Sequence, residues 1–267
     1  RSRKLTYEPS WEYPDTGGGL MEDSATFIGH DTGFRLVPRD FLTRAPYNVF
    51  AERRGPLPSS IRLAASTPPL VGNIYPYAEP VLAASGNQLA FAYVYVDPAD
   101  PVSSATEICT SFYQDDHFTP PAPIRNDTQG EFSPTLAFDA SGRIVAVWER
   151  IKVADLSETA EIEDIAPWIE IVHSCFDPQT KTWSTPTALT DNDYLDYGPQ
   201  LSRSHAGKLA LIWKSNVANE LMGTAESPTR VHFAVWDEAG AAFQPAETLP
   251  GDFAGARDFR LAYEGEQ

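Results

Sequence analysis

The residues best suited to bind a ligand are acidic and amide side chains in two short polar segments. The first segment holds Asp191, Asn192, Asp193 and Asp196, and the second holds Asp127 and Glu131. Carboxylate and amide oxygens are the ligands that Ca²⁺ prefers, about six to eight at a time. The first segment therefore predicts a Ca²⁺ site, and both segments predict ligand binding. The competing interpretation is a solvated turn whose Asx side chains bond the local backbone, since the glycine and distal glutamate of an EF-hand loop are missing.

Other reactive residue types occur without a recognised spacing. None of the five histidines lies in an HExxH pattern, and no GxSxG nucleophile elbow exists. The two cysteines, Cys109 and Cys175, form no CxxC pair, so a structural zinc site is not expected. They fall in corresponding segments of an internal repeat. The sequence is compatible either with a disulfide between them or with two buried free thiols. No catalytic residue is assigned by these motifs.

The charge of the chain excludes two classes of partner. Lys and Arg total 20 against 37 Asp and Glu, a formal net charge of −17. Nucleic acids and anionic membrane surfaces require a basic patch, so neither is expected as a partner. No apolar run of about 18 residues exists to span a membrane. A cation, a basic protein or a neutral glycan remains compatible with this charge, and so does a role in solubility alone.

Four segments share one pattern, and this internal repeat is the strongest signal in the sequence. Each has a leucine two residues after a proline or phenylalanine, and each ends in a glycine. The leucines are Leu82, Leu136, Leu201 and Leu261, at intervals of 54, 65 and 60 residues. A glycine between two short apolar segments is typical of a hairpin turn. The repeat unit therefore begins with a β-hairpin.

Two further strands complete each unit. The apolar second strands at 89–93, 144–148 and 209–213 are followed by third strands at 107–113, 168–176 and 230–236. Fourth strands at 118–124, 183–189 and 243–249 begin with an aromatic residue and carry prolines, which edge strands tolerate. Four antiparallel strands with a buried start and a proline-marked edge form the blade of a β-propeller. At the repeat positions, Trp148, Trp183 and Trp213 are expected to pack between blades.

The sequence thus predicts an all-β fold, a β-propeller of four-stranded antiparallel blades that is incomplete in this chain. The propeller region is 71–267, with blades at about 76–130, 131–195 and 196–255 and a partial fourth blade at 256–267. Residues 1–70 form an irregular N-terminal segment, with a candidate outer strand of a preceding blade at 60–64. Because a blade must bury its faces against neighbours, the remaining blades must come from 1–70, from more of the parent chain or from another chain.

Part of the repeat resembles a known family. The segment 183–191, the Gly198-Pro-Gln-Leu sequence and the hairpin to Trp213 are similar to bacterial sialidase-like propeller repeats of the Asp-box or BNR-like type, over roughly 76–267. Residues 174–183 resemble a degenerate Asp box with its glycine absent and its spacing stretched. In that family the Asp box is a structural turn between the third and fourth strands. The resemblance therefore implies a fold more than an activity.

Sialidase activity would require more than the fold. The resemblance implies an arginine triad for the substrate carboxylate, a tyrosine nucleophile with a glutamate partner, and an aspartate acid. The candidate arginines recur at no common blade position, and no Arg-Ile-Pro motif occurs; they are Arg125, Arg143, Arg203, Arg230 and Arg260. Because Arg143 follows the hairpin Gly142, its side chain is expected in solvent. The catalytic residues stay unassigned.

Propeller topology points to one functional face. Loops from second to third strands and links from fourth strands to the next blade lie at the same end of the blades. Here the loops are long and variable, the middle one is strongly acidic, and the links are acidic too. We expect a protein or glycan partner to bind there, with Asp127, Glu131, Asp191, Asp193 and Asp196 as contacts. The chain is interpreted as an extracellular or cell-envelope module for binding or assembly. The alternative is a sialidase-like glycoside hydrolase that acts on glycans.

Overall fold

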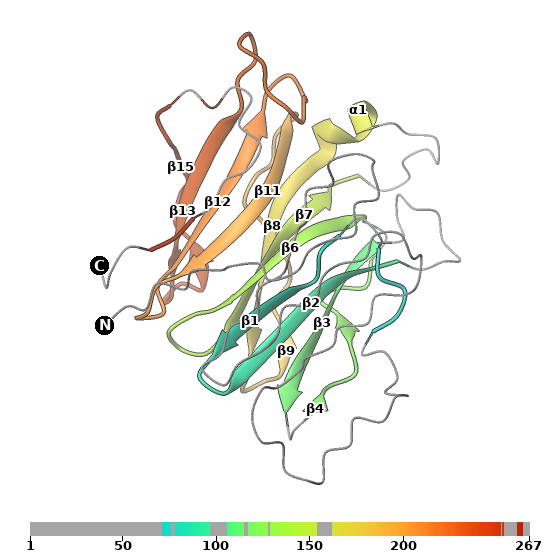
Figure 1. The fold of residues 1–267 in the computed structure, drawn as a ribbon, viewed down its shortest axis with the longest axis vertical. Helices are drawn as coiled ribbons and strands as arrows, with labels where there is room; N and C mark the ends of the chain where they lie inside the picture. Colours follow the sequence, from blue (N-terminus) through green and yellow to red (C-terminus); the bar gives the residue numbers. More distant parts are fainter. Residues whose placement is uncertain are drawn as a thin grey trace, which may run out of the picture. The chain divides into compact units, whose positions relative to one another are not determined.

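The computed structural model describes residues 71–75, 78–96, 106–114, 117–127, 129–153, 162–251, 253 and 261–263. The predicted N-terminal segment 1–70, with its candidate strand at 60–64, lies outside these residues. So does most of the partial fourth blade, of which 261–263 are described and belong to no strand. The other described residues form three antiparallel sheets, one for each predicted complete blade (Figure 1).

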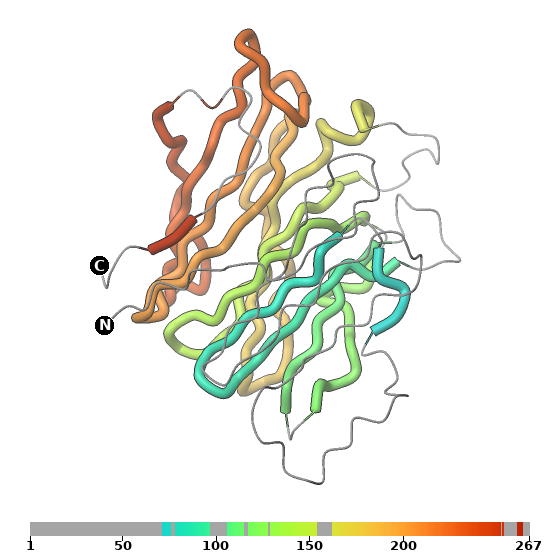
Figure 2. The backbone as a smooth tube through the Cα atoms, viewed as in Figure 1, coloured from blue at the N-terminus to red at the C-terminus, as the bar shows by residue number. Residues whose placement is uncertain are grey.

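Each sheet has four strand positions in the predicted order. The first blade contains β1 (Val81–Ser85), β2 (Gln88–Val96), β3 (Thr106–Gln114), β4 (His117–Phe118) and β5 (Ala122–Pro123). The second contains β6 (Glu131–Phe138), β7 (Ile144–Ile151), β8 (Ile169–Asp177), β9 (Thr182–Trp183) and β10 (Thr187–Ala188). The third contains β11 (Leu195–Arg203), β12 (Leu209–Asn216), β13 (Arg230–Asp237), β14 (Ala242–Phe243) and β15 (Glu247–Thr248). The backbone trace follows these up-and-down strands from one blade to the next (Figure 2).

Proline divides every fourth strand into two short pieces. Both pieces pair with the third strand of the same blade: β4 and β5 with β3, β9 and β10 with β8, and β14 and β15 with β13. Pro121, Pro186 and Pro245 stand between the pieces, where a residue without an N–H cannot extend the ladder. The predicted proline-marked edge strand is therefore confirmed in an interrupted form.

The repeat positions are structurally equivalent. Leu82 pairs with Phe91, Leu136 with Ala146 and Leu201 with Leu211, which is the same step of the first hairpin in each blade. The register shifts after Phe132 and after Tyr197, at two corresponding β-bulges that hold the repeat prolines. The register shared by all three sheets, with a bulge common to the second and third, shows that the sheets are copies of one blade.

The hairpin glycines serve two purposes, which Gly207 illustrates. Its φ of +85° lies in the left-handed region that side chains disfavour. A Cβ there would also stand 2.7 Å from the Cα of Ala140, in the first hairpin turn of the second blade. The residue therefore both closes its own turn and lets two neighbouring blades approach closely.

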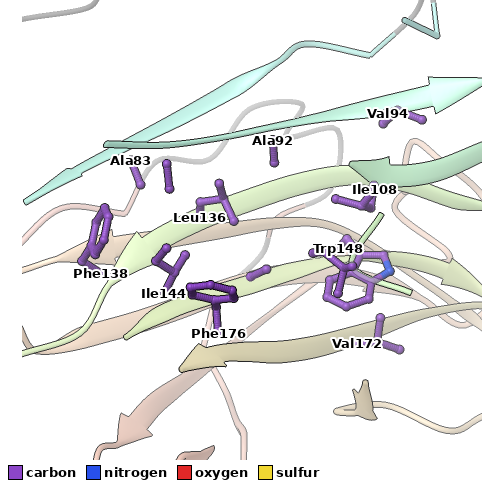
Figure 3. Packing of buried hydrophobic residues seen from close by; sticks show 13 residues of the cluster. Ala83, Ala92, Val94, Ile108, Leu136, Phe138, Ile144, Trp148, Val172 and Phe176 are labelled. Atoms are coloured by element: carbon purple, nitrogen blue, oxygen red, sulfur yellow. The ribbon is translucent and has the colours of Figure 1, made fainter. Parts of the chain in front are cut away.

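The core lies between blades. One cluster joins Ala92 and Ile108 of the first blade to Leu136, Trp148 and Phe176 of the second, and the labelled side chains fill the space between the two sheets (Figure 3). A second cluster joins the opposite face of the second blade to the third, and is centred on Val145, Val147, Leu211, Trp213 and Trp236. Alternating side chains of one strand thus point to different neighbours.

The predicted aromatic core is confirmed, and the cysteines are separate. Trp148 and Trp213 are buried, and Trp183 packs partly buried against the first cluster. Cys109 and Cys175 are both buried free thiols in different clusters, so no disulfide joins them. Within the described ranges no helix has the length and apolarity of a membrane span.

One short helical segment was not predicted. Residues Ile162–Ile165 form α1, and Ala166–Trp168 continue as a 3₁₀ turn that leads into β8. Acidic residues in the first turn, Glu163 and Asp164, favour the start of a helix, and Pro167 is tolerated at the second position of the 3₁₀ turn, where its missing N–H is not needed. The segment shapes the loop before β8 in the second blade.

Candidate functional site

Polar side chains gather at one end of the blades, where the second-to-third loops and the blade-to-blade links meet. We call this the loop end, and the opposite end, with the hairpin turns, the turn end. Lys152, just past β7, contacts Asp191 and Asp193 in the link before β11, and Arg150 of β7 contacts Asp127 in the link before β6. The predicted grouping of loops and links at one end is therefore confirmed.

The first junction, between the first and second blades, contains Glu107, Asp127, Glu131 and Arg150. Glu131 is fully buried and accepts a hydrogen bond from the backbone N–H of Ile108 at 3.0 Å. Glu107 Oε1 accepts the N–H of Asp127 at 3.1 Å. Arg150 forms an ion pair with Asp127, and its Nε lies 3.6 Å from Glu131 Oε1. Asp127 and Glu131 therefore flank one guanidinium across a blade boundary, and Glu107 binds the backbone of the same link.

This crowding changes the acidity of the junction. Burial, followed by the charge of Glu131, raises the pKa of Glu107 to about 8. Burial raises the pKa of Glu131 to about 7 against the Ile108 N–H and the Arg150 charge, which lower it. Among the described residues, no hydrogen-bond donor reaches Glu107 Oε2 or Glu131 Oε1, so neither atom gains a hydrogen bond that would favour the charged form. Near neutral pH the junction holds protons that free carboxylates would have lost.

The second junction, between the second and third blades, is built around Lys152. Its Nζ lies 2.9 Å from Glu170 Oε1 and 3.5 Å from Asp191 Oδ1, and it donates to the backbone oxygen of Asn192. Glu170 Oε1 also accepts the N–H of Asn192 at 2.8 Å. Although burial lowers it, contacts with Glu170 and then Asp191 raise the pKa of Lys152. The ammonium therefore stays charged and holds the link in place.

Asp196 completes the second junction from β11. It is buried and accepts the indole N–H of Trp213 at 3.0 Å and the side-chain N–H of Asn192 at 2.7 Å. Burial raises the pKa of Asp196 to about 6, although both hydrogen bonds lower it. The carboxyl fixes the start of the third blade to its own second strand and to the preceding link.

The two junctions occupy equivalent positions. Glu107 and Glu170 hold the same site in β3 and β8 and cap the following link in the same way. Glu131 and Asp196 likewise stand at the same step of β6 and β11, before each bulge. Sequence reasoning missed Glu107 and Glu170, although their common place in the repeat was visible. The repeat does not point to Arg150, because the third blade has Ser215 at the same position. Lys152 was likewise not singled out by the repeat pattern.

The predicted site residues divide into buried and exposed groups. Glu131 and Asp196 are buried and internally bonded, whereas the side chains of Asp191 and Asp193 are 86% and 96% exposed. The predicted Ca²⁺ ligands do come together, but the Lys152 ammonium lies among them. Among the described residues, no three His, Cys, Asp or Glu side chains are arranged to hold a metal ion. The Ca²⁺ site stays a prediction.

An ordered loop from Asn216 to Thr229 in the third blade, the 216–229 loop, lies at the same end. The buried Asn216 side chain accepts the N–H groups of Ala218 and Glu220 at 2.9 and 3.1 Å and donates to the Ser227 carbonyl at 3.0 Å. At the other side of the loop, the Thr229 hydroxyl accepts the N–H of Gly223, where a Cβ would stand 2.3 Å from the Thr229 nitrogen. Internal hydrogen bonds therefore fix the loop.

Large apolar side chains at the loop end remain in solvent. The 216–229 loop exposes Val217, Leu221 and Met222, with about half of each residue accessible. Trp168, after α1, is also exposed, and Lys152 Nζ stands 5.6 Å from its ring centroid. Sequence reasoning missed these residues, because nothing in their spacing distinguishes them from a packed segment.

The turn end holds a shallow depression of about 570 Å³ lined by turns of the second and third blades. Arg143 at its edge is bound rather than free, which corrects the expectation of a solvated side chain. Its guanidinium pairs with the buried Asp139 at 2.8 Å and donates to the Glu238 carbonyl, and its side chain is 22% exposed. Asp139 accepts a hydrogen bond from Arg143 Nε inside the turn and one from the Trp236 indole N–H across the blade boundary, which explains this arrangement.

The acidity of the first junction predicts a pH dependence of stability. Glu107 and Glu131 keep their protons in the folded state up to about pH 8 and 7, and in the unfolded state only to about pH 4.5. Unfolding therefore releases protons in this window, and stability falls as pH rises through it. We expect a loss of about 3 kcal/mol between pH 5 and 8, measured by urea unfolding.

The variant Glu107→Gln separates this local effect from general charge repulsion. It should flatten the pH profile between pH 5 and 8, whereas Glu247→Gln, at an exposed position of β15, should leave the slope unchanged. Equal slopes for the wild type and Glu107→Gln would contradict the assignment.

Several solved structures resemble this chain at low identity. The alpha-L-arabinanase of Penicillium chrysogenum, complexed with arabinobiose, is 15% identical over 64% of this chain and 50% of that chain, with a TM-score of 0.40. A protein of unknown function from Dyadobacter fermentans is 14% identical over 62% and 53% of the two chains, with a TM-score of 0.43. Trypanosoma rangeli sialidase is 9% identical over 62% and 30%, with a TM-score of 0.43.

This chain spans about half the length of the first two of these structures. No protein-family model matches the sequence, and no curated protein does. The class of protein is therefore defined by the chain's own geometry. Three four-stranded antiparallel sheets with one register, packed face against face through repeated apolar positions, are blades of a β-propeller.

Proposed function

We propose that this propeller is a binding or assembly module that contacts its partner at the loop end. The observation that carries the proposal is that some polar residues at this end are buried and structural, whereas others are exposed. Glu131, Glu170 and Asp196 are buried in contacts at the blade junctions, while Asp191 and Asp193 project into solvent at the end that also holds the ordered 216–229 loop. A rigid scaffold that displays exposed side chains on fixed loops is the usual arrangement of a recognition surface.

The sialidase-like details belong to the same proposal. The turn between β8 and β9 serves as a degenerate Asp box, and its structural role is supported by the N–H of Gln179, which donates to Asp177 Oδ1 at 2.7 Å. The corresponding turn of the third blade has the same arrangement, with Asp237 accepting the N–H of Ala239 at 3.2 Å. An extracellular or cell-envelope location, and further blades from more of the parent chain or another chain, complete this proposal.

Hydrogen–deuterium exchange tests where a partner binds. Two probes of different chemistry are used, a soluble neutral arabinoxylan and a lysine-rich amphipathic peptide. We expect at least one of them to slow exchange in 190–196 and in the 216–229 loop, because bound loops open less often. Exchange in the turns at 139–143 and 177–181 should not change. Protection restricted to the turn end would contradict the proposal, and so would no protection with either probe.

A second candidate function is a glycoside hydrolase of sialidase-like type. The raised pKa values of Glu107 and Glu131 favour it, because a general acid must keep its proton near neutral pH. The full burial of Glu131 weighs against it, since a substrate must reach the acid. Turnover of aryl glycosides that Glu107→Gln abolishes without unfolding the protein would favour the hydrolase. No turnover by the wild type would remove this candidate.

A further inference from the structure

We infer that the 216–229 loop and Trp168 form a docking surface for a basic, amphipathic protein segment. This inference rests on the proposed function and specifies its partner. It stands on three independent observations: the order of the loop, the apolar side chains that the loop exposes, and the sign of the charges around them.

The loop is held before any partner arrives. Asn216, Thr229 and Gly223 fix its backbone from inside, and two bonds tie it to the first strand of the blade. The N–H of Leu195 donates to Asn219 Oδ1 at 2.8 Å, and the Tyr197 hydroxyl donates to the Leu221 carbonyl at 2.7 Å. A preordered loop loses little conformational entropy on binding, which favours affinity.

The apolar side chains on this ordered loop are only about half covered by the described fold. Val217, Leu221 and Met222 are 47%, 49% and 51% exposed, although the hydrogen-bonded backbone could equally well carry polar residues. Single exposed apolar residues are ordinary, whereas a group on one rigid loop marks an interaction site. Methionine and leucine also adapt to the shape of an apolar partner. Leu221 and Met222 are therefore the residues that would contact the apolar face of a bound segment.

Trp168 extends this surface toward the second blade. The 3₁₀ turn that ends with Trp168 contributes Ala166 to the apolar cluster that also contains Leu195 and Tyr197. Tyr197 in turn bonds the 216–229 loop through Leu221. The 3₁₀ turn that carries the exposed indole therefore packs on the same cluster as the strand that holds the 216–229 loop.

The surrounding charges select a basic partner. The exposed carboxylates at this end of the two blades belong to Glu163, Asp164, Asp191, Asp193, Glu220 and Glu226. The nearby lysines are engaged: Lys152 pairs with Glu170 and, more loosely, with the largely exposed Asp191 and Asp193, and Lys214 lies over the Tyr197 ring at 4.3 Å. Arg230 is the exposed cation of this region in the described residues. A segment with lysines beside an apolar stripe matches both features.

The probe is a synthetic amphipathic peptide of about 18 residues with leucines on one helical face and lysines on the other. Binding of the labelled peptide is followed by fluorescence anisotropy with the full chain. We expect saturable binding that the double variant Leu221→Ser with Met222→Ser weakens at least about tenfold, because two apolar anchors are lost. Asp191→Asn with Asp193→Asn should weaken it about threefold at low salt and have less effect in 0.5 M NaCl, where exposed charges are screened.

Matched controls separate the possible results. Leu82→Ser changes an apolar residue of similar exposure on the first blade and should leave peptide binding unchanged. A peptide with serine in place of leucine should bind much more weakly. Equal affinity of the wild type and the Leu221/Met222 variant would overturn the inference. If arabinoxylan slows exchange at the loop end but the peptide does not bind, the inference would also be overturned, while the proposed binding function would stand.

A second copy of this chain is the other occupant that the test must recognise. Sedimentation velocity of the wild type at rising concentration should show no self-association that the Leu221/Met222 variant removes. Such self-association would assign the surface to a second copy and would overturn the inference of a basic segment.

Discussion

The variant Trp148→Ala is expected to lower the free energy of unfolding by about 4 kcal/mol. Trp148 is fully buried and packs in the cluster that contains Ala92, Val94 and Ile108 of the neighbouring blade. Removing the indole therefore leaves a cavity between two blades rather than inside one sheet, and each blade has little core of its own to compensate. Urea unfolding followed by circular dichroism measures the loss.

Two further variants make this prediction specific. Trp168→Ala removes the same side chain from an exposed position and should cost less than about 1 kcal/mol. Trp148→Phe keeps most of the buried volume, so its loss in free energy of unfolding should be intermediate. It provides a folded variant for comparison if Trp148→Ala does not fold. A loss for Trp148→Ala no larger than that for Trp168→Ala would contradict the assignment of Trp148 to the inter-blade core.

The variant Arg150→Met should destabilise the protein by about 3 kcal/mol at pH 8. It leaves the buried Glu131, with Glu107 and Asp127, without the guanidinium that offsets their charge. At pH 5 the loss should be much smaller, since protonation of Glu107 and Glu131 removes the repulsion. Urea unfolding at both pH values tests the difference.

A double-mutant cycle with Glu131→Gln isolates the interaction. Because glutamine carries no charge to compensate, Arg150→Met should cost less in that background. Arg125→Met serves as the matched control: it pairs with the same Asp127 at 3.7 Å but is 51% exposed, so its loss should stay below about 1 kcal/mol. Losses for Arg150→Met that are equal at both pH values would contradict the role assigned to the charges of Glu107 and Glu131.

The secondary structure and the fold followed from the sequence to a large extent. Strand order, the hairpin glycines and the proline-marked fourth strands were predicted from local patterns, and the common register of Leu82, Leu136 and Leu201 confirms the repeat. These features depend on residues a few positions apart, on local backbone preferences and on the alternation of apolar and polar residues along a strand. The local sequence determines all three. The α1 helix, of four residues, gave too short a pattern to predict.

The candidate site was predicted only in part. The acidic links were expected at the loop end, and Asp191 and Asp193 do lie there in solvent. That Glu131 and Asp196 would be buried could not be inferred, because burial depends on how closely the next blade approaches. The exposed Leu221 and Met222 were missed for the same reason, since the sequence does not show that the described fold leaves about half of each residue uncovered.

The sequence by itself determined the architecture of this protein: three repeats of an antiparallel four-stranded blade, with apolar positions that require neighbours and acidic segments between blades. Only the tertiary structure decided which charges meet. Arg150 reaches Asp127 across 23 residues of chain, and Lys152 reaches Asn192 across 40. Repetition is a property of local patterns, whereas ion pairing and acidity depend on distance and burial, which exist only after the blades have packed against one another.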